Sequence, residues 1–258
     1  MTGKAFNHGQ ICFHRGQLPQ ARVWFQEAVE ESRQEGTWIE VASALGNLAN
    51  ICALLEETYE AEQYYREILQ IQRTHGNPDL IGETFVNLGN LKADSGEFDQ
   101  ARAYYLEALD LLQPLNNHRA LGILYGNLAL QEVATRQYNQ AIEHFGQALD
   151  CHRCVGNEQG LAITFSQLGN TYLSQGNVQQ AERCLNNASE HFIKLGNKPG
   201  EAAVLRNLGT LYETRGDRIS ATRCQEQAVK IDRQFHLPNL EEDQIRLQQL
   251  RESPDTSG

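Results

Sequence analysis

Asn87-Leu88-Gly89-Asn90 is the stretch that decides the fold, because it returns every 40 residues along the chain. The other copies are Asn47-Leu48-Ala49-Asn50, Asn127-Leu128-Ala129-Leu130, Gln167-Leu168-Gly169-Asn170 and Asn207-Leu208-Gly209-Thr210, with a degraded first copy at Asn7-His8-Gly9-Gln10. Twelve positions after each Gly or Ala comes a second small residue, a series that runs from Ala21 to Ala221. Self-similarity at such a period indicates stacked units, none of which can bury its apolar face alone.

Each copy carries two apolar stripes at helical spacing, one on either side of a short polar break. In the second copy Leu45, Leu48 and Cys52 precede the break, and Ala61 and Tyr65 follow it. Two antiparallel helices per copy account for this pattern. The sequence therefore predicts an all-α, right-handed solenoid of six antiparallel helix hairpins.

We expect a single body over residues 2–251, without a domain boundary. The expected hairpins are 2–36, 37–76, 77–116, 117–156, 157–196 and 197–236. A capping helix is expected over 239–251, followed by a disordered tail over 252–258.

Recurrent glycine inside the first helix of each hairpin predicts a close crossing of the two helices. Glycine in mid-helix costs roughly 1 kcal/mol relative to alanine, so its recurrence needs a compensating contact. We expect Gly89 to face Ala101, with the ring of Tyr105 beside them.

With Leu, Gly or Ala, Tyr and Ala at these offsets, the chain resembles the tetratricopeptide repeat family over about residues 2 to 235. Its 40-residue period and its Leu-Gly-Asn tripeptides, such as 88–90 and 168–170, are similar to the longer repeats of Pins-type adaptors and kinesin light chains. The pattern departs from the family at the ends, where His8 replaces Leu and Gln225 fills an aromatic slot. Such departures are typical of solenoid caps.

Composition argues against several partners and compartments. With 33 acidic and 22 basic residues the formal charge is −11, which repels nucleic acid and anionic membranes. The N-terminus has no signal-peptide core, and no apolar run reaches the length of a membrane span. The six cysteines stand where other copies carry apolar residues. We therefore expect a soluble, cytoplasmic protein in a reducing compartment.

The candidate site is the side of each first helix that the core does not use. It carries an uncharged ladder of amides, and an amide can bond the main chain of an extended ligand through both its donor and its acceptor. The resemblance implies contact with a peptide for the residues at one rung, Asn47, Asn87, Asn127 and Asn207. The full candidate set is Asn47, Asn50, Asn87, Asn90, Asn127, Leu130, Gln167, Asn170, Arg206 and Asn207. An equally supported alternative is that these amides bond neighbouring helices and hold the stack together.

Three other kinds of site are disfavoured. The basic clamp that resembling domains use for chaperone C-termini is absent, because of its equivalent positions only Arg206 is basic. No catalytic motif is present, so we expect no enzyme and no cofactor. Cys151 and Cys154 are two residues apart but lack a second pair, so we interpret them as ordinary helix residues rather than as a metal site.

The sequence thus predicts a non-enzymatic scaffold that binds a protein or peptide in its concave groove. Ile123, Leu130, Ile163 and Leu54 are expected to add apolar pockets. A set of acidic residues should favour neutral or basic ligands, namely Glu83, Asp94 and Glu213. The alternative is a structural protein that forms oligomers through its ends or its convex face.

Overall fold

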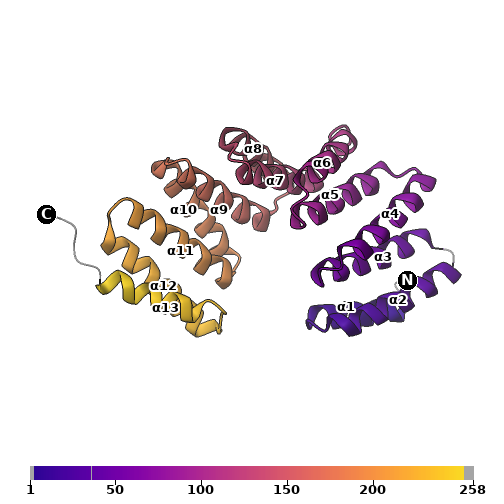
Figure 1. Cartoon of the computed structure of the whole chain (residues 1–258), viewed down its shortest axis with the longest axis horizontal. Coiled ribbons are helices and arrows are strands. Elements are labelled where there is room, and N and C mark those ends of the chain that lie inside the picture. Colours follow the sequence, from indigo (N-terminus) through magenta and orange to yellow (C-terminus); the bar gives the residue numbers. More distant parts are fainter. Residues whose placement is uncertain (1–2, 36, 253–258) are drawn as a thin grey trace. The chain divides into compact units, whose positions relative to one another are not determined.

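The computed structural model describes residues 3–35 and 37–252, which form helices joined by short turns (Figure 1). The described residues contain no strand. The helices are α1 Lys4–His14, α2 Leu18–Glu35, α3 Trp38–Leu54, α4 Thr58–His75, α5 Pro78–Asp94, α6 Phe98–Leu112, α7 His118–Ala134, α8 Tyr138–Cys154, α9 Glu158–Ser174, α10 Val178–Lys194, α11 Lys198–Thr214, α12 Arg218–Phe235 and α13 Leu240–Glu252.

The chain divides into two compact units, residues 1–120 (unit 1) and 121–258 (unit 2). Unit 1 holds α1 to α6 and the first residues of α7, and unit 2 holds the rest. The expected single body over 2–251 stays a prediction, as does the handedness of the solenoid. Of the expected tail over 252–258, Glu252 belongs to α13, and residues 253–258 lie outside the described residues.

Turns between hairpins follow from a paired signal in the sequence. Gly156 takes a left-handed conformation, with φ of 63°, and ends α8. The side chain of Asn157 then accepts a hydrogen bond from the Gly160 backbone N–H at 2.9 Å and caps α9. A left-handed glycine stop followed by an amide N-cap satisfies groups that helix ends otherwise leave unpaired. Asn77, Asn117 and Asn197 cap α5, α7 and α11 in the same way.

The predicted close crossing of helices is confirmed at Gly89. A Cβ atom added there would overlap the ring of Tyr105, and Ala101 is fully buried. In unit 2 the same position is Gly169, whose added Cβ would lie 2.8 Å from Leu185. Glycine recurs because the second helix places a large side chain directly on the first helix.

Buried polar contacts are made at the repeat position that is Lys92 in α5 and Glu132 in α7. Lys92 pairs with Glu62 of the preceding hairpin at 3.0 Å and with Glu97 of its own hairpin at 3.1 Å. Glu132 is almost fully buried and accepts the 2.8 Å contact of His144 Nδ1 within its own hairpin. Burying a charge needs a paired and hydrogen-bonded partner, so Lys92 links two hairpins and Glu132 holds α7 to α8.

Helix α13 packs on α12 and is held by buried charged and polar groups. Arg206 of α11 donates to Asp243 at 2.7 Å and to Asp232 of α12 at 3.1 Å. Asp232 and Asp243 are buried. Gln225 donates from Nε2 to the Asp243 carbonyl at 3.1 Å. The residues that depart from the repeat pattern at this end therefore receive the last helix.

Candidate functional site

The predicted amides lie on the first helices of the hairpins in both units. We call Asn47, Asn50, Asn87 and Asn90, on α3 and α5, the amide face of unit 1. The amide face of unit 2 lies on α7, α9 and α11 and comprises Ile123, Asn127, Leu130, Ile163, Gln167, Asn170 and Asn207. Residues three and four apart share one side of a helix, so each helix contributes its members side by side.

Two of the predicted amides bond within their own hairpin. The Tyr65 hydroxyl donates to Asn50 Oδ1 at 2.6 Å, and the Tyr105 hydroxyl donates to Asn90 Oδ1 at 2.8 Å. Burial raises the pKa of Tyr65 to about 12, and burial also raises the pKa of Tyr105. A buried phenol needs a hydrogen-bond partner, and the amide oxygen supplies it. The structural interpretation therefore accounts for the oxygens of Asn50 and Asn90.

The remaining amides are less engaged. Asn47 donates from Nδ2 to the Ser43 carbonyl of its own helix at 2.8 Å. Asn127 is half-buried at the equivalent position of α7. No hydrogen bond to any residue within 3–35 and 37–252 is made by the side chains of Asn87, Gln167, Asn170 and Asn207. These four amides keep both donor and acceptor available to a ligand.

Arg206 belongs to the internal cluster that holds α13 rather than to the open face. Its side chain is 21% exposed and pairs with Asp232 and Asp243. Burial, together with the adjacent carboxyl group of Asp243, raises the pKa of Asp232, although Arg206 opposes that shift. An arginine whose fork is occupied by two carboxylates has few donors left for a ligand.

Of the predicted acidic residues, Glu83 and Asp94 are exposed in unit 1. Glu213, in unit 2, is paired with Arg246 at 2.7 Å. Glu213 therefore does not contribute to the expected preference for basic ligands, because Arg246 of α13 already neutralises its charge. This pairing could not be predicted from the sequence, because α13 departs from the repeat register.

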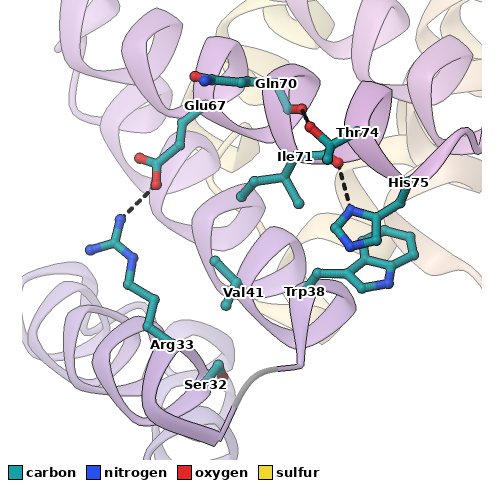
Figure 2. A pocket seen from close by; sticks show the side chains of 9 residues that line it. All are labelled: Ser32, Arg33, Trp38, Val41, Glu67, Gln70, Ile71, Thr74 and His75. Atoms are coloured by element: carbon teal, nitrogen blue, oxygen red, sulfur yellow. Dashed lines mark hydrogen bonds and ion pairs between the residues drawn. The ribbon is translucent and has the colours of Figure 1, made fainter.

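A hollow in unit 1 was not predicted. It has a volume of about 580 Å³ and lies between α2, α3 and α4 (Figure 2). Trp38, stacked on His75 with ring centroids 4.4 Å apart, lies at one side, and Arg33 and Glu67 pair at 2.6 Å on the other. Ser32 stands here at the position that Leu112, His152 and Phe192 fill in later hairpins. A small residue at a position that carries larger side chains in later hairpins is the sequence feature from which the hollow could be predicted.

The predicted Cys151 and Cys154 differ in their exposure. Cys151 is buried and Cys154 is exposed. Within residues 3–35 and 37–252 no group of three or more His, Cys, Asp or Glu side chains is placed to hold a metal ion. None of the helices described is both long enough and apolar enough to span a bilayer.

Comparisons with solved structures show the same fold. BtubC (BKLC) from P. vanneervenii is 23% identical, with a TM-score of 0.78 over 85% of this chain and 92% of that one. A Rap protein complexed with Competence and Sporulation Factor is 15% identical, with a TM-score of 0.70 over 96% of this chain and 74% of that one. Kinesin light chain-like repeats from Podosopora anserina are 18% identical, with a TM-score of 0.62 over 75% of this chain and 95% of that one.

The comparison with curated protein sequences returned no match. The family model described as tetratricopeptide repeat matches residues 2–74, 80–153 and 160–234. Together with the helix hairpins of the structure, these matches confirm the predicted all-α solenoid class. The chain belongs to the tetratricopeptide repeat family.

Proposed function

We propose that the chain is a non-enzymatic scaffold whose amide faces hold an extended segment of a partner protein. The observation that supports this is the presence of unengaged amides on three of the first helices, α5, α9 and α11, at Asn87, Gln167, Asn170 and Asn207. Donors and acceptors on a rigid helix can pair with main-chain groups of a ligand at little cost in ordering. The Rap neighbour is itself a complex with a second component, Competence and Sporulation Factor, which is consistent with this use of the fold.

Affinity capture with matched variants tests the proposal. One variant carries Asn87→Ala, Gln167→Ala and Asn207→Ala on the amide faces. The control carries Gln63→Ala, Gln147→Ala and Gln227→Ala, which removes three exposed amides from the second helices α4, α8 and α12. Both variants are first checked for unchanged circular dichroism and thermal midpoint.

We expect the first variant to lose partners that the wild-type chain and the control retain. Losing two or three hydrogen bonds of about 1 kcal/mol each should weaken capture roughly tenfold or more. Equal capture by all three proteins would remove the amide faces from the binding site.

Self-assembly is the second candidate, and exposed apolar residues on the first hairpin favour it. Ile11 of α1 and Val23 of α2 are 49% and 60% exposed. Sedimentation velocity over a wide concentration range tests it directly. Growth in mass that Val23→Glu abolishes would favour assembly, whereas a constant monomer mass would exclude it.

A further inference from the structure

We propose that the amide face of unit 2 selects an extended, uncharged segment that carries aliphatic side chains. The inference rests on the proposed function and narrows it to one class of ligand at one face. It is carried by three features of that face: the absence of an unpaired charge, a set of exposed aliphatic residues, and the open amides.

Every charged residue on the first helices of unit 2, from Leu121 onward, already has a partner. These residues are Glu132 of α7, Glu158 of α9, and Lys198, Glu201, Arg206 and Glu213 of α11. Glu132 pairs with His144, and Glu158 pairs with His191 and Lys194. Lys198 and Glu201 pair with each other. Arg206 pairs with Asp232 and Asp243, and Glu213 pairs with Arg246. A charged ligand group would give up hydration here without gaining a counter-ion, which disfavours it.

Exposed aliphatic side chains are gathered on the same face. Ile123 and Leu130 lie two turns apart on α7 and are 46% and 42% exposed. Ile163 is 41% exposed and takes the position of Ile123 in the next hairpin. Single exposed aliphatic side chains are common on protein surfaces. Aliphatic side chains aligned beside uncharged amides form a surface whose burial by a ligand is favourable, because it removes apolar area from water.

The open amides favour an extended ligand over a helical one. Gln167 and Asn170 of α9 and Asn207 of α11 make no hydrogen bond with the described residues, so each can both donate and accept. The main chain of an extended segment offers unpaired N–H and C=O groups, whereas a helix has already paired its own. Successive side chains of an extended chain point to opposite sides, so those that face one surface are an even number of positions apart. We therefore infer that the ligand carries aliphatic side chains two or four positions apart.

Unit 1 provides an internal comparison, because its amide face is chemically different. Glu83 occupies the position of Ile123 and Ile163, and neither Glu83 nor Asp94 forms an ion pair with the described residues. Because Glu83 itself lies on an amide face, the matched control is Ile193 of α10, a second helix of unit 2, whose side chain is 56% exposed. Ile193→Lys makes the same change of charge and side chain as Ile163→Lys away from the amide face.

The test is a selection from a random-peptide library displayed on phage, with the full chain as bait. Selected peptides are synthesised, and their affinities are measured for the wild type, Ile163→Lys, Ile123→Lys and the control Ile193→Lys. Because all three substituted side chains are exposed, the variants should keep the wild-type thermal midpoint.

We expect uncharged peptides with paired aliphatic residues, whose affinity falls about tenfold in Ile163→Lys and in Ile123→Lys but not in Ile193→Lys. Their binding should not change with salt, because no ion pair forms.

Two other outcomes overturn the inference in distinguishable ways. Charged peptides that lose affinity in the Asn87, Gln167 and Asn207 alanine variant would leave the proposed function standing and remove the selectivity. A library that yields no peptide, or only peptides indifferent to both sets of variants, would remove both.

Discussion

At the scale of single residues, each amide is assigned by the side chain that faces it. Asn90 faces the hydroxyl of Tyr105, whereas Asn170, at the same repeat position, has Leu185 in the place of that tyrosine. The buried phenol needs an acceptor and finds it in Asn90, while the leucine leaves Asn170 free. The choice between a structural and a binding amide is therefore made by the second helix.

Asn90→Ala should lower the free energy of unfolding by about 1 kcal/mol, because it leaves the Tyr105 hydroxyl buried without its partner. Asn87→Ala, the exposed neighbour on the same helix, should change it by no more than about 0.5 kcal/mol. Urea denaturation measures both. A double-mutant cycle with Tyr105→Phe should recover the coupling, and additive effects would contradict the pairing.

Gly89→Ala should destabilise the chain by about 1–3 kcal/mol, because the new methyl group overlaps the Tyr105 ring. Gly126→Ala is the matched control, since nothing lies within 4 Å of a Cβ atom there. That change should stabilise α7 by up to about 1 kcal/mol through the lower entropy of the unfolded chain. Thermal and urea unfolding report both, and equal effects would argue against the close crossing at Gly89.

Some of these residues could be read from the sequence and others could not. Gly89, Ala101 and Tyr105 were predicted because each recurs at a fixed offset and glycine has a known cost. The bond between Asn90 and Tyr105 was missed, because it joins two helices and depends on where their axes cross. The sequence places Arg206 on the open face. Its partners, Asp232 and Asp243, follow no repeat offset, so its pairing with them could not be predicted.

At the scale of elements, the end of α8 carries a buried histidine where other hairpins place Leu112 or Phe192. A Cβ atom added at Gly122 or Gly160 would lie within 3 Å of the His152 ring, so the ring is wedged between α7 and α9. Asn157 Nδ2 lies 3.3 Å from His152 Nδ1. The same amide caps α9 through its oxygen, which leaves its N–H to donate to the ring. Burial lowers the pKa of His152, because the protonated ring would lose both hydration and this donor.

His152→Leu should therefore reduce the acid sensitivity of the fold. In the wild type the folded pKa lies below the unfolded value of about 6.5, so the unfolded chain takes up the proton first. The stability contributed by neutral His152 is present above that value and is lost as the pH falls through the folded pKa. Urea unfolding at a series of pH values measures the difference between variant and wild type. A constant difference across the series would contradict a buried neutral imidazole.

Helix α13 shows which part of an element the sequence can predict. The sequence predicts a capping helix over 239–251, and the structure has a helix over Leu240–Glu252. The cluster around Arg206 that holds it was not expected, because polar contacts between elements leave no periodic signal. Breaking a buried charge pair costs more than losing an exposed one, since the remaining carboxylates stay buried.

At the scale of the whole molecule, packing inside each unit is between neighbours in the chain. In unit 1 the packed helix pairs run consecutively from α1 with α2 to α5 with α6, and in unit 2 they run from α8 with α9 to α12 with α13, where α9 also touches α11. This pattern follows from the 40-residue period, which the sequence shows directly. In such an array, stability is close to a sum of units and nearest-neighbour contacts, so a local defect should stay local.

Arg206→Ala tests this at the C-terminal end. The change leaves Asp232 and Asp243 buried without their counter-ion, which should cost about 3 kcal/mol locally. Arg246→Ala, which removes a half-exposed pair with Glu213, should cost less than about 1 kcal/mol. Amide hydrogen exchange followed by mass spectrometry should show faster exchange in α11, α12 and α13 of the first variant, with α1 to α6 unchanged. Faster exchange throughout would mean that the chain unfolds as one cooperative body, and the nearest-neighbour description would then be wrong.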